Sequence, residues 1–224
     1  MALSRARACL FLALIAVTLA SAGLSAQSPA ERWIKALAEF DAADRATPPP
    51  QGEVLFLGSS TIVSWDTTRA FPGIRTINRG VWSSSLADAV QRIDRLVLPY
   101  APRLIVLYAG DNDINGGATS EQVAAEFERF VFTVQARLPQ TRIVFIGLKP
   151  SIQRWTQIHR MRLANTLIRE FCEHDDRVAF LDVDGVMLGW DEKPRKDLFV
   201  EDGLHLSAQG YQLWNTLLRP FLAP

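Results

Sequence analysis

Apolar segments of strand length alternate with helical patterns along most of this chain, and this alternation most constrains its fold. Strand-like runs occupy residues 54–57, 74–77, 104–108, 143–146 and 178–181. Amphipathic helical patterns separate or follow them at residues 84–97, 120–138, 153–174 and 207–219. Strands that alternate with helices form a mainly parallel sheet covered on both faces, through right-handed crossovers. We therefore predict an α/β protein, a three-layer α/β/α sandwich around a five-stranded, mainly parallel sheet.

The length of the chain fits one such domain. Its 224 residues, 48% of them hydrophobic, can fill one core, whereas two domains would be cramped. We assign the domain to residues 51–224. Residues 27–50 precede it as an amphipathic helix followed by a proline-rich linker, because Trp33, Leu37 and Phe40 recur at helical spacing.

The first 26 residues have the pattern of a secretory signal peptide. Two arginines precede an apolar run at 8–20, which is short for a bilayer span, and small residues follow it. Cleavage is expected after Ala22 or after Ala26, and an uncleaved membrane anchor is the alternative. We therefore expect a secreted or periplasmic protein without a stable membrane span once residues 1–26 are removed. Cys172 is then the one remaining cysteine, so no internal disulfide can form.

Charge and ligand spacing exclude several partners. The 24 basic residues balance the 24 acidic ones, and no basic stripe with interleaved aromatic residues is visible, so nucleic acid is not an expected partner. Residues 111–116 resemble the start of a calcium-binding loop, but Gln122 stands where a bidentate glutamate is needed. No cluster has zinc spacing. We expect neither a metal ion nor an organic cofactor.

Two distant segments carry residues suited to nucleophilic catalysis. Ser60 follows a glycine turn after the first strand, where a serine hydroxyl is exposed at the carboxyl edge of the sheet. Asp202 and His205 lie three residues apart on a turn before the last helix. An aspartate in that position can bind His Nδ1–H and leave Nε2 free to take a proton from a serine. A simple turn and a satisfied buried histidine are the alternative interpretations of these segments.

A third segment, residues 110–113, follows the third strand and reads Gly-Asp-Asn-Asp. By itself it is equally well a polar loop rich in turn-forming residues. An amide from Asn112 can also donate a hydrogen bond to the oxyanion that forms when a serine attacks an ester carbonyl. The three segments together are far more specific than any one of them.

These segments resemble the conserved blocks of the SGNH hydrolases, the superfamily of GDSL-type lipases and esterases. The resemblance covers nearly the whole chain from about Val54 onwards and implies a flavodoxin-like α/β/α fold. It assigns Ser60 to the nucleophile, with Ser59 in place of the usual aspartate. It makes Asn112 the amide of the oxyanion hole, and Asp202 and His205 the other two members of a catalytic triad.

The second block departs from the family pattern. Residues 78–85 lie where the family often has Asn-x-Gly-x-Gly-Gly-x-Thr/Ser, and the glycine whose N–H serves the oxyanion hole falls on Ser83. A backbone donor survives the change from glycine to serine if its φ and ψ are open to a side chain. The resemblance thus implies an oxyanion hole formed by the N–H groups of Ser60 and Ser83 and the amide of Asn112. We also expect the neighbouring Trp82 to narrow the pocket.

The expected activity is hydrolysis of carboxylic esters with short acyl groups, either acetyl esters of carbohydrate or lysophospholipid-type esters. An acyltransferase that uses the same acyl-enzyme is one alternative. A non-catalytic binding protein that retains the fold is the other, motivated by Ser83. The sequence leaves the natural ester and the oligomeric state open.

Overall fold

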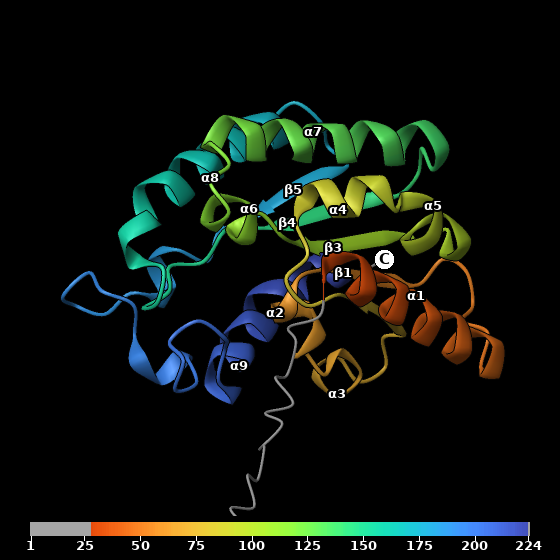
Figure 1. Cartoon of the computed structure of the whole chain (residues 1–224), viewed down its shortest axis with the longest axis horizontal. Coiled ribbons are helices and arrows are strands. Elements are labelled where there is room, and N and C mark those ends of the chain that lie inside the picture. Colours follow the sequence, from red (N-terminus) through yellow and green to blue (C-terminus); the bar gives the residue numbers. More distant parts are fainter. Residues whose placement is uncertain (1–27, 224) are drawn as a thin grey trace, which may run out of the picture.

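The computed structural model describes residues 28–223, and a five-stranded parallel sheet lies at their centre (Figure 1). All neighbouring strands are parallel, in the order β2-β1-β3-β4-β5. The strands are β1 (Val54–Gly58), β2 (Thr76–Gly80), β3 (Leu104–Tyr108), β4 (Arg142–Ile146) and β5 (Val178–Leu181). The predicted α/β sandwich is thereby confirmed. The predicted signal peptide, residues 1–26, lies outside the described residues.

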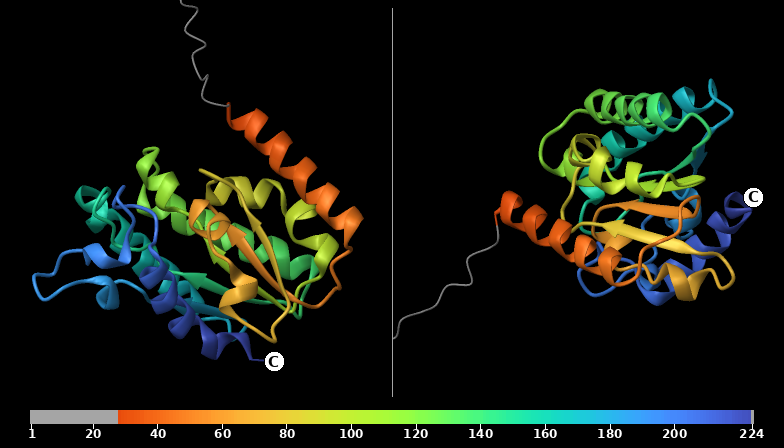
Figure 2. Two further views of the ribbon diagram at one scale, coloured as in Figure 1. Left: turned by 90° about the horizontal axis from the view of Figure 1, so that it is seen from below. Right: turned by 90° about the vertical axis from the view of Figure 1, so that its right-hand side faces the viewer.

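Helices cover both faces of this sheet (Figures 1 and 2). The α-helices are α1 (Pro29–Ala46), α2 (Ser60–Val63), α3 (Thr67–Ala70), α4 (Leu86–Gln91), α5 (Ile93–Leu96), α6 (Asp111–Asn115), α7 (Ser120–Arg137), α8 (Ile158–Cys172) and α9 (Ala208–Leu218). Short 3₁₀ turns are η1 (Leu98–Tyr100), η2 (Trp155–Gln157), η3 (Gly185–Met187), η4 (Lys196–Leu198) and η5 (Arg219–Leu222). No helix within residues 28–223 is long and apolar enough to span a bilayer.

Each face of the sheet has its own apolar core, because successive side chains of a strand point to opposite faces. Leu55 and Leu57 of β1 pack with α4, α5, α7 and α8 on one face. Val54 and Phe56 pack with α2, α3 and α9 on the other. Both faces of β1 and β3 are buried, which explains why these strands read as continuous apolar runs.

The second strand and the predicted helix over 84–97 differ from the sequence prediction. The second strand runs from Thr76 to Gly80, because its register aligns Thr76 with Val54 and carries the pairing through a polar stretch. The polar side chains of this stretch find hydrogen-bond partners inside the protein. The Asn78 amide, for example, donates to the carbonyls of Ile62 (2.7 Å) and Trp65 (3.2 Å). The predicted helix over 84–97 is divided into α4 and α5 at Arg92, whose backbone leaves the helical region (φ −120°, ψ 17°).

The first helix packs beside edge strand β2 through a buried arginine. The Arg79 guanidinium, from β2, lies over the rings of Phe40 (4.7 Å) and Tyr100 (4.6 Å) and pairs with Asp44 of α1. Tyr100 accepts from Arg79 Nε (2.9 Å) and donates to Asp44 (2.6 Å). Trp33 of α1 joins the apolar core. These contacts join α1 to the sheet as part of the same folded unit.

We predict that Arg79→Ala lowers the free energy of unfolding by about 3 kcal/mol, because it leaves the Asp44 carboxylate without its buried partner. The matched control is Lys35→Ala, which removes an exposed helix pair at 3.9 Å and is expected to cost less than about 0.5 kcal/mol. Urea unfolding of both variants measures the difference. Equal costs for the two would show that Arg79 does not hold α1 in place.

Candidate active site

The turn that carries Ser60 requires glycine before it. Gly58 ends β1 with φ +146°, and a Cβ there would lie 1.9 Å from the carbonyl oxygen of Tyr108. The same carbonyl accepts from Ser59 N (3.0 Å), so the chain leaves the sheet tightly against β3. Helix α2 then begins at Ser60, and its first N–H groups have no partner within a helix. The serine hydroxyl is thus placed at the carboxyl edge of the sheet beside free backbone donors.

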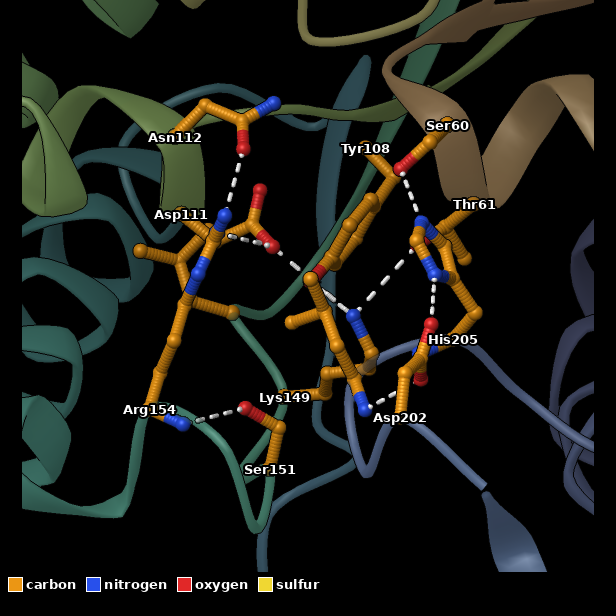
Figure 3. Close-up of polar contacts among 12 residues, drawn as sticks. Ser60, Thr61, Tyr108, Asp111, Asn112, Lys149, Ser151, Arg154, Asp202 and His205 are labelled. Carbon is orange, nitrogen blue, oxygen red and sulfur yellow. Dashed lines mark hydrogen bonds and ion pairs between the residues drawn. The ribbon is translucent and has the colours of Figure 1, made fainter. Parts of the chain in front are cut away.

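A second turn brings Asp202 and His205 to this serine (Figure 3). Asp202 Oδ1 accepts from the N–H groups of Leu204 (2.8 Å) and His205 (2.9 Å), and Gly203, which follows Asp202, has φ +65°. The other oxygen, Oδ2, lies 2.5 Å from His205 Nδ1, and His205 Nε2 lies 2.9 Å from Ser60 Oγ. A carboxylate only accepts, so Nδ1 donates to Asp202 and Nε2 accepts from Ser60.

The electrostatics of Asp202 fit this arrangement. Partial burial raises the pKa of its carboxyl, but hydrogen bonds from the His205 ring and from the N–H groups of Leu204 and His205 outweigh burial and lower it to about 2. Asp202 is therefore ionised at neutral pH and holds the tautomer that leaves Nε2 basic.

The predicted oxyanion donors lie on three loops at the same edge. Within residues 28–223 no acceptor binds the backbone N–H of Ser60 or of Ser83. The Asn112 amide, from α6, donates to the carbonyl of Ser84 at 3.0 Å. That bond uses one of its two N–H groups and leaves the other free.

Ser83 adopts the backbone conformation that a glycine would favour. Its φ is +55°, in the left-handed region, and its side chain is exposed. The loop is held in this shape by its neighbours: Val81 N and Ser84 Oγ both donate to the carbonyl of Gly58, at 2.8 and 3.0 Å. Ser83 therefore holds the left-handed conformation that glycine favours, at the cost of some conformational strain.

Asp113 binds the segment of Asn112 to the segment that follows Ser83, a contact that sequence reasoning missed. Both of its carboxylate oxygens accept from Leu86 N, at 3.1 and 3.2 Å. Burial raises the pKa of this carboxyl to about 6, against the lowering effect of the Leu86 hydrogen bond. The sequence did single out Asp113, because it belongs to the same polar block as Asn112. Its partner is the backbone N–H of Leu86, however, and no residue pattern reveals a backbone partner.

Other side chains surround the predicted catalytic residues. The Trp82 ring stands edge-on to the His205 ring at 5.6 Å and is 49% exposed, so it forms a wall beside the imidazole. Lys149 and Arg154, from the loop after β4, lie behind the site and face Asp111 (Figure 3). No group of three or more potential metal ligands occurs among residues 28–223.

Comparison with known proteins identifies the family. A family model for the GDSL-like lipase/acylhydrolase family matches residues 55–213. The chain belongs to this family. It is 29% identical to platelet-activating factor acetylhydrolase IB subunit alpha1 of Bos taurus over 187 residues, which cover 80% of this chain and 78% of the relative.

Solved structures agree on the fold. A GDSL-like lipase from Bacteroides thetaiotaomicron superposes with a TM-score of 0.70 at 17% identity, over 83% of this chain and 96% of the other. An acetyl esterase mutant solved with an acetate ion superposes with a TM-score of 0.61 at 15% identity, over 77% and 96% of the two chains.

Family membership makes this GDSL-like protein a carboxylic ester hydrolase, and its substrate a small-molecule ester. The expected SGNH resemblance is confirmed. The non-catalytic alternative loses its support. The roles of individual residues remain predictions that the geometry favours.

We predict that Ser83→Gly raises the free energy of unfolding by up to about 1 kcal/mol, because glycine relieves the positive φ while adding some entropy to the unfolded chain. Ester turnover is expected to stay within about threefold, since the backbone N–H is retained. Urea unfolding and initial rates measure the two effects. A much faster variant would show instead that the Ser83 side chain obstructs the site.

We also predict a pH-dependent effect of Asp113→Asn. Because the folded pKa of Asp113 lies above the unfolded one, the folded wild type retains a proton that the unfolded chain has released between about pH 4 and pH 6. The wild type thus loses roughly 1–3 kcal/mol of stability over this interval, which the variant does not lose. Unfolding at pH 4.5 and 7.5 should show the variant gaining relative to wild type at the higher pH. A difference that stays constant would contradict the prediction.

Proposed function

We propose that the protein is a serine esterase in which Ser60, His205 and Asp202 form the catalytic triad. One observation carries the proposal, the continuous chain of hydrogen bonds from Ser60 Oγ to His205 Nε2 (2.9 Å) and from Nδ1 to Asp202 (2.5 Å). A serine is a weak nucleophile by itself and requires a base within about 2.6–3.2 Å, itself held by a third group. Ser60 has such a base in His205, and Asp202 is the third group that holds it, without any rearrangement.

The proposed reaction follows from this geometry. Ser60 Oγ attacks the ester carbonyl carbon while His205 Nε2 takes the hydroxyl proton, and Asp202 stabilises the imidazolium that results. The tetrahedral intermediate collapses when the imidazolium gives its proton to the leaving alcohol, which breaks the ester bond and leaves an acyl-enzyme. Water, activated by His205, then releases the acid and restores Ser60.

The developing oxyanion is proposed to lie between the N–H groups of Ser60 and Ser83 and the free N–H of Asn112. Their lack of other acceptors within residues 28–223 supports this role. Removal of one such donor typically costs about 10²–10³ in kcat, so each of the three is expected to matter.

A short acyl group, in particular acetyl, is the proposed substrate feature. Two observations support it. The relatives and neighbours include an acetylhydrolase and an acetyl esterase. Trp82 occupies space beside His205, where it limits the room for a long chain. The alcohol part is proposed to be a carbohydrate or a lysophospholipid-type group. The N-terminal sequence supports a secreted or periplasmic enzyme.

We predict that Ser60→Ala abolishes hydrolysis of p-nitrophenyl acetate, butyrate and octanoate, and that the wild-type rate falls as the acyl chain lengthens. The matched control is Ser59→Ala, because the neighbouring Ser59 makes no side-chain capping bond and is expected to leave the rate within a few-fold. Spectrophotometric rates with purified protein measure both. Turnover by pure Ser60→Ala protein at the wild-type rate would overturn the triad. A rate that rises with chain length would overturn the short-acyl proposal alone.

The acyltransferase alternative is tested in the same assay. An excess of a sugar or other alcohol acceptor is added and the products are separated. If the acyl group passes to the acceptor in preference to water, transfer and not hydrolysis is the main reaction of the same acyl-enzyme.

A further inference from the structure

Behind the predicted oxyanion hole lies a buried cluster of charged side chains that the proposed mechanism does not use. Asp111 is 5% exposed and Lys149 is 2% exposed, while the Arg154 side chain is 10% exposed. Arg154 Nη1 lies 3.0 Å from Asp111 Oδ2, and Lys149 Nζ lies 3.7 Å from the same oxygen. Charged side chains are rarely buried unless they are paired, so a cluster of this kind calls for a reason.

The cluster reaches the site through one hydrogen bond. Arg154 Nη2 donates to Asn112 Oδ1 at 2.9 Å (Figure 3). On its other side, the Asn112 amide nitrogen donates to the Ser84 carbonyl at 3.0 Å. Asn112 is thus held between a group that can only donate and a group that can only accept.

This pair of partners permits one orientation of the amide. If the side-chain amide were turned over, its nitrogen would face the Arg154 guanidinium and its oxygen would face the Ser84 carbonyl. Both contacts would then be repulsive, and both part-buried hydrogen bonds would be lost. In the allowed orientation the second N–H of Asn112 is directed away from both partners and remains available to the substrate.

Arg154 also strengthens the donor that it orients. A hydrogen bond from a cation to the amide oxygen draws electron density from the nitrogen, so the N–H groups become better donors. The Arg154 side chain is 10% exposed, so its charge acts on the Asn112 amide with less screening than a surface charge would. Lysine could not replace arginine equally, because only the planar fork reaches Asp111 and Asn112 at the same time.

We propose that Arg154 is a positioning residue of the oxyanion hole: anchored by Asp111, it orients and polarises the Asn112 amide for the transition state. The inference rests on the proposed function. Arg154 acts through Asn112 and does not itself contact the substrate.

The test is a double-mutant cycle with p-nitrophenyl acetate, using the full protein. Arg154→Ala is expected to lower kcat about ten- to a hundredfold with KM within about threefold, because the lost interaction belongs to the transition state. Asn112→Ala is expected to lower kcat about 10²–10³-fold. In the Asn112→Ala background, Arg154→Ala should then change kcat by less than about threefold, since the residue through which it acts is gone.

Two further variants separate positioning from a general loss of structure. Arg162→Ala removes another arginine–aspartate pair (2.9 Å) from helix α8 and is expected to leave kcat within about twofold. Arg154→Lys keeps a positive charge beside Asp111 and should remain impaired. Millimolar guanidinium, but not ammonium, should restore part of the activity of Arg154→Ala.

The outcomes are distinguishable. If Ser60→Ala keeps wild-type turnover, the proposed function itself fails. If Ser60→Ala is inactive but the two losses multiply in the double variant, only the role of Arg154 in positioning Asn112 is overturned. A rise in KM with unchanged kcat would also overturn it, because Arg154 would then contact the substrate directly. If Arg154→Ala does not fold, Arg154→Lys in the same cycle decides the matter.

Discussion

The in-register parallel pairing of β1 and β3 is the constraint on which the site depends. This pairing sets Gly58 beside Tyr108, so that both strands end at the same level. The Tyr108 carbonyl occupies the space where a side chain on residue 58 would lie, and it binds Ser59 N at 3.0 Å. Two loops that are 50 residues apart in sequence therefore leave the sheet side by side, one with the proposed nucleophile and the other with Asn112.

Charge is arranged with opposite sign at the two ends of the site. At one end, the ionised Asp202 faces His205, where the proposed mechanism develops positive charge as the imidazole takes a proton. At the other end, Arg154 and Lys149 face a single carboxylate, Asp111, behind the Asn112 amide that is proposed to receive the developing negative charge. Both groups of charges are held by hydrogen bonds before substrate arrives, so little reorganisation is needed during the reaction.

Ser83 departs from the family pattern, yet it adopts the positive φ that a glycine would favour. The neighbouring Val81 and Ser84 hold the loop through the Gly58 carbonyl, and Asp113 and Asn112 hold it from the opposite loop. The left-handed conformation is thus imposed by the surroundings. A serine tolerates it because its side chain is directed to solvent, so the strain is limited to the backbone.

The sequence by itself determined the fold class, because apolar runs of strand length separated by amphipathic helices have few other solutions. It also located the candidate residues Ser60, Asn112, Asp202 and His205, since motifs keep their residue types and spacing. It misplaced the second strand, whose polar residues are satisfied by distant carbonyls and by Asp44. Only the tertiary structure decided the conformation of Ser83 and the partners of Asp113 and Arg154. Those depend on backbone groups and on side chains brought together across the sheet edge, and such contacts leave no periodicity or spacing in the chain.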